Sequence, residues 1–238
     1  MIKQFKNALF FLLFLIHPSI IKAQLDNQPV NLPKYDFQQI HFGFALGINS
    51  SDFLIHKTGN FNTLDSVYKI ESSPVAGLNL SIIGNLRIGQ HFDLRFIPTL
   101  AFSQRNLTYS LLLKDSTTID KTKKIESSYL EFPFDLKFKS KRVNNYRMYV
   151  LAGFKYAIDM VSQAKVNSVD KDLIKLKKND YGYEVGLGFD FYLSYFKFSP
   201  EIKMFNGLRN LLVPDNTIYA NPIDALYSKT FTISLTFE

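Results

Sequence analysis

The residue types that support nucleophilic catalysis come together at one place in this sequence. His56 follows Ser50, Ser51 and Asp52, and a serine hydrolase needs a hydroxyl nucleophile, a histidine base and a carboxylate that orients the base. The neighbouring residues have the composition of an ordinary loop, which favours a solvated segment over a hydrolase site. The chain has no cysteine and only four histidines, so it has no disulfides or thiolate chemistry, and a histidine-rich metal centre is disfavoured. We therefore expect a protein that is not an enzyme and has no cofactor.

A second candidate is a carboxylate pair, Glu131 and Asp135, on one face of a predicted strand. Paired carboxylates cleave glycosidic bonds in many hydrolases. Basic residues interleave this pair, so ion pairing explains it better than catalysis. The glycines of residues 182–188 alternate along a strand and precede no helix, so they do not form a phosphate-binding loop. We expect no small-molecule substrate.

The strand that carries these carboxylates is one of eight segments with a period of two. In the last segment, Phe231, Ile233, Leu235 and Phe237 alternate with hydroxyl residues, which is the pattern of a strand with one apolar and one polar face. The eight segments are residues 41–48, 77–86, 92–103, 130–139, 148–159, 181–192, 196–204 and 230–237. Each has about the length of a tilted transmembrane β-strand.

The connections between these segments alternate between long and short. The long ones are residues 49–74, 109–127, 160–180 and 206–227, and the short ones surround residues 89–90, 140–146 and 193–195. Outer-membrane barrels have long external loops and short periplasmic turns. The sequence therefore predicts an all-β protein whose residues 40–238 form an eight-stranded antiparallel transmembrane β-barrel of the outer-membrane type, with both termini in the periplasm.

The two faces of these strands distinguish a membrane barrel from its rivals. A soluble barrel of the lipocalin kind places its apolar side chains inside, around a ligand. Here the polar face carries Gly43, Gly47, Gly182, Gly186 and Gly188, which suits a narrow, crowded interior. The large aromatic side chains are then expected to face lipid, and a soluble barrel or a β-sandwich is the less favoured alternative.

Charged residues on the inward face are balanced. The expected lumen network contains five basic and five acidic residues, namely Arg95, Glu131, Asp135, Lys137, Lys155, Glu184, Asp190, Lys197, Glu201 and Lys203. An unpaired buried charge costs several kcal/mol, so these side chains are expected to pair for structural reasons. The functional alternative is an ion path, which the narrow lumen of an eight-stranded barrel disfavours.

The N-terminal residues have the pattern of an export signal. Residues 1–23 contain Lys3 and Lys6, then an apolar run over residues 8–16 that is too short to span a bilayer. We interpret residues 1–23 as a signal peptide and residues 24–39 as a periplasmic N-terminal segment. The formal net charge of +7 comes with no nucleic-acid motif, so no nucleic-acid partner is expected. Outer-membrane lipids are an expected partner of the lysine-rich external loops.

Two stretches, HFGFALGIN (41–49) and YLEFPFDLKFKSKRVNNYRMYVLAG (129–153), resemble the PorT family of Bacteroidetes. The resemblance implies an outer-membrane barrel that is an accessory component of type IX protein secretion, and of gliding motility in some species. It also implies other secretion-system proteins as partners and supplies no catalytic residues. The alternatives are a structural or adhesive barrel that acts through its external loops and, third, an outer-membrane lipid enzyme.

The turn at residues 140–146 is longer than a hairpin needs. It holds Lys141, Arg142, Asn144 and Asn145, in the part of the chain where the resemblance to PorT is most particular. We expect these four residues to be a docking point for a periplasmic secretion component, and the alternative is a solvated turn with no role.

Overall fold

All eight predicted strands are present, and they are longer than the sequence pattern suggested. The computed structural model describes residues 29–59, 67–112, 118–161, 174–215 and 217–238, so the predicted signal peptide lies outside the described residues. Within the described residues, one short 3₁₀ helix, η1 (Tyr35–Phe37), precedes nine strands. The strands are β1 (Ile40–Lys57), β2 (Val67–Arg87), β3 (Phe92–Phe96), β4 (Thr99–Leu112), β5 (Thr118–Lys139), β6 (Tyr146–Asp159), β7 (Asn179–Tyr192), β8 (Lys197–Gly207) and β9 (Ile223–Phe237).

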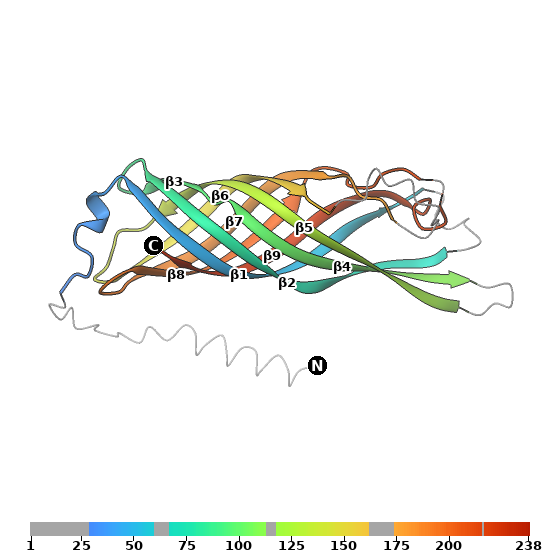
Figure 1. The fold of residues 1–238 in the computed structure, drawn as a ribbon, viewed down its shortest axis with the longest axis horizontal. Coiled ribbons are helices and arrows are strands. Elements are labelled where there is room, and N and C mark those ends of the chain that lie inside the picture. The colour runs from blue at the N-terminus through green and yellow to red at the C-terminus, as the bar shows by residue number, and fades with distance from the viewer. Residues whose placement is uncertain (1–28, 60–66, 113–117, 162–173, 216) are drawn as a thin grey trace, which may run out of the picture. The chain divides into compact units, whose positions relative to one another are not determined.

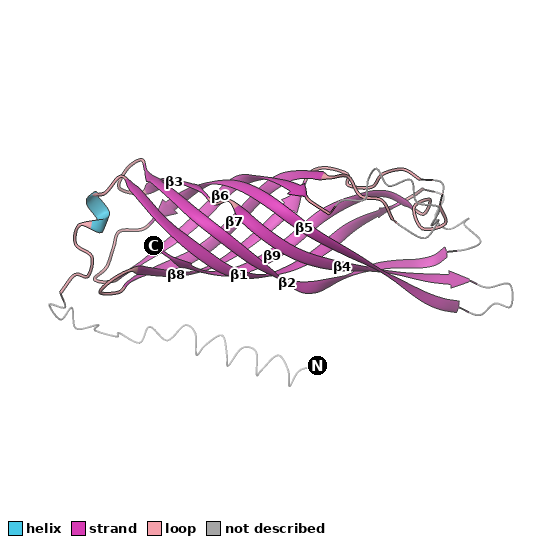
Figure 2. Ribbon diagram, in the orientation of Figure 1, coloured by secondary structure: helices cyan, strands magenta, loops and turns pink. Residues whose placement is uncertain are grey.

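These strands close into one antiparallel barrel (Figures 1 and 2). The ring closes where β1 pairs with both β2 and β9. Strands β3 and β4 are one strand interrupted at Pro98, which has no N–H to donate. The register on β5 is unchanged across this break, since Phe96 faces Phe134 and Thr99 faces Glu131. The ring therefore has eight strands, and the predicted fold class is confirmed.

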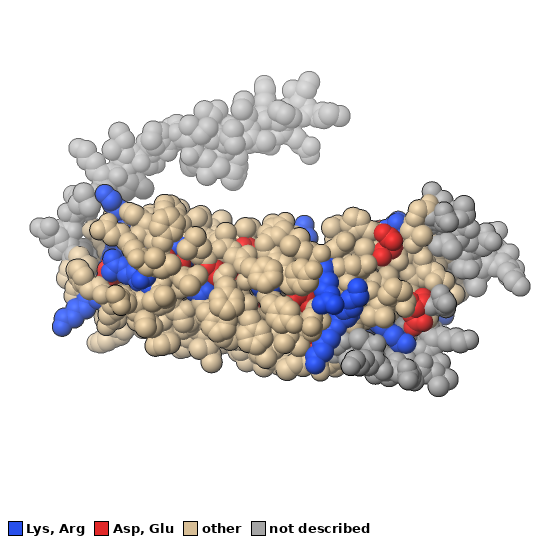
Figure 3. Space-filling view, turned by 90° about the horizontal axis from the view of Figure 1, so that it is seen from above, with Lys and Arg blue, Asp and Glu red and all other residues tan. Residues whose placement is uncertain are grey.

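The apolar side chains of the barrel point outward. Phe42 is 75% exposed and Ile82 is 68% exposed, whereas the alternating positions His41 and Asn85 are buried. Figure 3 shows the resulting uncharged surface along the middle of the barrel. Large exposed apolar areas are rare on soluble proteins, and this band has the character of the lipid-facing belt of a transmembrane barrel. No helix among the described residues is long and apolar enough to cross a membrane.

The predicted long loops at residues 49–74 and 109–127 are wrong, because most of their residues extend the strands. The β1–β2 ladder ends at Ser51 and Val75, beyond which β1 pairs only with β9, and β2 pairs only with β4. Residues 67–74 of β2, 104–112 of β4 and 118–128 of β5 thus form a three-stranded arm beyond the ring.

The arm differs from the predicted strands because its polarity is inverted. In β4, Thr99 and Ser103 are buried inside the barrel while Phe102 is exposed outside. Further along the same strand, Leu107 and Tyr109 are the buried residues, and polar residues alternate with them on the outside. This switch from polar-in to apolar-in is expected where a strand leaves lipid and enters water.

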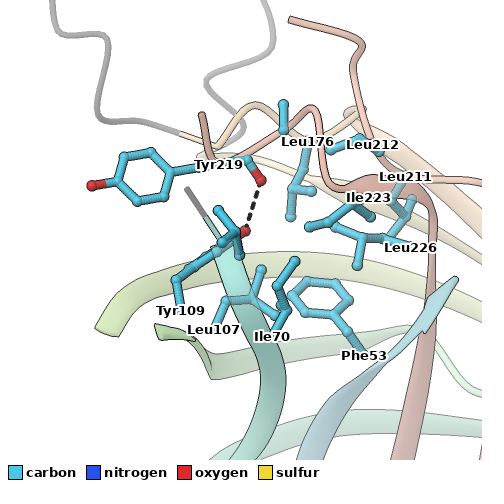
Figure 4. Close-up of a cluster of buried hydrophobic side chains, with 12 residues drawn as sticks. Phe53, Ile70, Leu107, Tyr109, Leu176, Leu211, Leu212, Tyr219, Ile223 and Leu226 are labelled. Atoms are coloured by element: carbon cyan, nitrogen blue, oxygen red, sulfur yellow. Dashed lines mark hydrogen bonds between the residues drawn. The ribbon is translucent and has the colours of Figure 1, made fainter. Parts of the chain in front are cut away.

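A hydrophobic cluster closes the barrel beside this arm (Figure 4). Residues 208–215 and 217–222, part of a predicted external loop, place Leu211 and Tyr219 against Ile70 and Leu107. The Tyr109 hydroxyl donates a hydrogen bond to the Tyr219 carbonyl at 3.0 Å. We call this end the loop end, and the opposite end, where η1 and Glu238 lie, the terminal end (Figure 1).

Candidate functional site

The lumen of the barrel is crossed by an ion pair between opposite walls. Arg95 Nη1 on β3 lies 2.6 Å from Glu201 Oε2 on β8, and these strands are four apart in either direction around the ring. The Tyr149 hydroxyl donates to the same carboxylate oxygen at 2.7 Å. Both charged side chains are 1% exposed. A charge-assisted bond across the full width of the lumen leaves no continuous aqueous path at this level.

Two lysines extend the network toward the loop end. Lys203 Nζ lies 3.3 Å from Glu184 Oε1 and 3.9 Å from Asp135 Oδ2. Lys155 Nζ lies 2.9 Å from Glu131 Oε1 and 3.9 Å from Glu184 Oε2. The structure therefore places Glu131 and Asp135, the carboxylate pair of the sequence, beside separate lysines rather than around a shared substrate space.

Further pairs occupy the lumen toward the terminal end. Lys137 Nζ lies 2.9 Å from Asp190 Oδ1, which also accepts a hydrogen bond from the Ser199 hydroxyl at 2.7 Å. Lys197 Nζ lies 2.8 Å from Glu238 Oε2. With these contacts, each of the ten residues expected in the lumen takes part in at least one ion pair.

Glycine on the inward face leaves room for the charged side chains in the narrow lumen. A Cβ atom added to Gly153 would lie 2.2 Å from Asp135 Oδ1 and 2.3 Å from the Phe134 carbonyl oxygen, so no larger residue is accommodated there without movement. The cavity that remains beside Arg95, Lys155 and Glu201 has a volume of about 20 Å³, which is the space of about one water molecule.

Four further members of the network were not predicted from the sequence. Asp93 pairs with Lys139 at 2.5 Å, Glu238 approaches Arg95 Nη2 at 3.7 Å, and Tyr149 bonds Glu201 as described above. Asp93 and Lys139 have the correct strand parity, so the alternation itself could have identified them. Tyr149 and Glu238 also have the inward parity, but Tyr149 is aromatic and Glu238 follows the last strand, so their residue type and position did not mark them as members of the network.

The N-terminal segment closes the terminal end of the lumen. The Tyr35 side chain inserts there, and its hydroxyl bonds Glu238 Oε2 and Lys197 Nζ, each at 2.8 Å. Its ring stacks on His41 with centroids 3.9 Å apart. Burial, together with the charge of Glu238, raises the pKa of Tyr35. Burial would also raise the pKa of Glu238, but Lys197, Arg95 and Lys137 outweigh it and lower that pKa.

Two of the four predicted docking residues hold this N-terminal segment in place. The Arg142 guanidinium bonds Asp36 Oδ2 at 3.3 Å and the Asn31 carbonyl, and it stacks 3.7 Å above the Tyr192 ring. The Asn145 side-chain oxygen accepts a hydrogen bond from the Asn31 amide at 2.8 Å. Arg142 and Asn145 thus have a structural role within the chain.

The other two docking candidates differ from this pair. Lys141 is exposed. Asn144 has a positive φ of 49°, a conformation that asparagine tolerates better than most residues, and its carbonyl accepts a hydrogen bond from Arg142 Nε at 2.8 Å. Asn144 therefore shapes the turn, and the charged side chain of Lys141 is exposed.

The hydrolase-like grouping does not assemble into a catalytic site. Ser51 points into the lumen and bonds Thr230, while the Asp52 carboxylate accepts hydrogen bonds from the Phe53 amide and the Ser72 hydroxyl. His56 packs edge-on against an aromatic ring instead. Within the described ranges, no group of three or more metal-ligating side chains comes together.

Comparisons with known proteins give one family match and several similar solved structures. The profile of a family described as the outer membrane protein beta-barrel domain matches residues 22–213. No curated protein matches the chain in sequence. Similar solved structures include OprG from Pseudomonas aeruginosa, at 14% identity and a TM-score of 0.43 over 83% of this chain and 91% of that one. Neisserial surface protein A is similar at 10% identity and 0.41 over 84% and 98%, and Ail of Yersinia pestis at 12% and 0.36 over 84% and 98%.

Proposed function

Because the chain belongs to the outer membrane protein beta-barrel domain family, we propose that it is a non-conducting barrel that serves as an accessory component of type IX protein secretion. In this proposal the protein acts through partners at its ends and does not carry cargo through its lumen. The terminal end faces the periplasm and the loop end faces the outside of the cell, as the arm and the long β6–β7 and β8–β9 connections at the loop end favour.

The observation that carries the non-conducting role is the ion pair of Arg95 and Glu201 across the lumen. Tyr35 at one end and the hydrophobic cluster around Leu107 and Tyr219 at the other end enclose this pair. A folded or extended polypeptide cannot pass without breaking buried ion pairs, at several kcal/mol each. Purified protein in a planar bilayer should therefore show no steady conductance, and stable open-channel currents would contradict the proposal.

The secretion role is supported by the resemblance of residues 41–49 and 129–153 to the PorT family. The test is a deletion strain in which a type IX cargo protein is located by fractionation. We expect the cargo to accumulate in the periplasm and export to return when the full chain is supplied. Normal export in the deletion strain would refute this role.

The orientation is tested separately with single cysteines, since the chain has none of its own. Lys121 at the loop end and Lys141 at the terminal end are both exposed. With a membrane-impermeant reagent on whole cells, Lys121→Cys should label and Lys141→Cys should not. The reverse result would invert the topology.

A structural or adhesive barrel is the second candidate function. The three-stranded arm favours it, because a paired surface that projects beyond the ring and packs on a hydrophobic cluster is suited to contacts outside the cell. A barrel lacking the arm's outer residues would separate the two candidates. Loss of cell attachment with normal export would favour adhesion over secretion.

A further inference from the structure

A group of basic and amide side chains crosses three neighbouring strands at the loop end. We define this basic row as Lys178, Asn179, Asn206, Arg209 and Lys229. Lys178 and Lys229 are exposed, and the other three are partly exposed. Toward the terminal end from Asn206 and Lys229, the outward residues of the same strands are apolar: Ile202 is 51% exposed and Phe231 is 47% exposed. The row therefore lies at the boundary between the apolar band and the polar end of the barrel.

The strand register brings the members of the row together. Asn206 of β8 faces Lys229 of β9. The Leu208 amide donates to the Tyr181 carbonyl at 2.9 Å. Arg209 lies one residue beyond this contact toward the loop end, and Asn179 and Lys178 lie two and three residues beyond Tyr181 in the same direction. Figure 3 shows Lys and Arg side chains gathered across the barrel where the uncharged surface gives way to mixed charge.

The cations of the row are not neutralised within the described part of the chain. Other lysines near the loop end have carboxylate partners, such as Lys69 with Glu71 at 2.7 Å and Lys175 with Asp215 at 3.2 Å. Among the described residues, no carboxylate lies within 4 Å of Lys178, Arg209 or Lys229.

The carboxylate opposite the row in the strand register, that of Asp52, forms hydrogen bonds with other groups instead. Asp52 of β1 is opposite Lys229 in the β1–β9 ladder, but its Oδ1 accepts hydrogen bonds from the Phe53 amide and the Ser72 hydroxyl. Lys229 Nζ lies 5.5 Å from the centroid of the Phe231 ring. Its aliphatic stem thus follows the apolar band, as lysines at a membrane boundary do.

We propose that the basic row binds the phosphate group of an outer-leaflet glycolipid whose acyl chains cover the apolar band below. Lysine and arginine form charge-assisted hydrogen bonds to phosphate oxygens, and each cation near an anionic membrane surface strengthens binding about fivefold. Asn179 and Asn206 supply amides for the sugar hydroxyls. The inference rests on the proposed orientation, in which the loop end meets the outer leaflet, and is independent of the secretion role.

The test uses the full chain in detergent and bisphosphorylated lipid A as the probe, with bound lipid counted by native mass spectrometry. The variant Lys178→Gln, Arg209→Gln, Lys229→Gln should bind lipid A roughly 100-fold more weakly than the wild type, because three cations are lost. Dephosphorylated lipid A should bind the wild type about as weakly as lipid A binds the variant.

A matched control removes the same charge from the arm. Lys69, Lys121 and Lys124 are exposed on β2 and β5, and changing all three to Gln should leave lipid A binding within about twofold of the wild type. Equal loss in the control, equal binding of dephosphorylated lipid A, or equal binding of phosphatidylglycerol vesicles would each overturn the proposal. Reversed cysteine labelling would overturn the orientation as well, whereas normal export in the deletion strain would refute only the secretion role.

Discussion

The hydroxyl of Tyr35 lies 2.8 Å from Glu238 Oε2, although 203 residues separate the two in the sequence. This contact joins the segment before the first strand to the residue after the last one, and Lys197 Nζ contacts both groups at 2.8 Å. The closure of the terminal end therefore depends on a buried carboxylate that must remain ionised.

Low pH should destabilise the barrel, because protonation of Glu238 weakens the contacts that close the terminal end. The pKa of Glu238 is lowered in the folded protein, since Lys197, Arg95 and Lys137 outweigh the effect of burial. A carboxylate with a lowered folded pKa stabilises the fold above its unfolded pKa, about 4.3, and this contribution is lost as the pH falls further. We expect the temperature at which the barrel unfolds on heated gels to fall between about pH 5 and pH 3. Glu238→Gln should unfold earlier at pH 7 and show a smaller acid-dependent drop; an unchanged profile would contradict this assignment.

Gly153→Ala should destabilise the barrel. The new Cβ would meet Asp135 Oδ1 at 2.2 Å and the Phe134 carbonyl oxygen at 2.3 Å, and overpacking of this kind costs about 1–3 kcal/mol. Gly89→Ala is the matched control, because nothing lies within 4 Å of its added Cβ. The measurement is the midpoint of urea unfolding in detergent, and equal midpoints for the two variants would disprove the crowding argument.

A charge on the outer face should test the lipid-facing band. Leu187 is 51% exposed near the middle of β7, and Leu187→Arg should cost about 2–4 kcal/mol at the bilayer midplane. Tyr195 is 92% exposed in the turn at the terminal end, so Tyr195→Arg should cost about 0–1 kcal/mol. Refolding into lipid vesicles measures both, and a similar cost at both sites would argue against the band.

The turn at residues 140–146 offers both a test variant, at Arg142, and its matched control, at Lys141. Arg142→Ser removes the contacts to Asp36, Asn31 and Tyr192, so amides of residues 31–37 should exchange with deuterium faster. Lys141→Ser changes an exposed side chain, and exchange should remain as in the wild type. If Lys141 docks a secretion partner, its variant alone should lower export while the fold is unchanged. Normal export with Lys141→Ser would remove this lysine from the mechanism.

The alternation of residue types by itself determines much of this protein. A period of two in eight segments predicts the strands, and the polarity of each face predicts that Phe42 points out and Glu201 points in. These are local properties, because a pleated strand sends successive side chains to opposite sides whatever its partners are. The inward face of eight strands with balanced charge is therefore predictable from the sequence, including the ten charged residues that line the lumen.

Which inward residues contact each other depends on the closure of the ring, which the local pattern does not predict. Arg95 meets Glu201 only because β3 and β8 lie opposite each other. Glu238 joins the network only because the ring brings the end of β9 beside Lys197 of β8 and Arg95 of β3. The arm also escaped prediction, since Leu107 and Tyr109 follow the same period with the opposite polarity. A periodicity records that one face is buried, but the surroundings of the strand, lipid or water, decide which face that is.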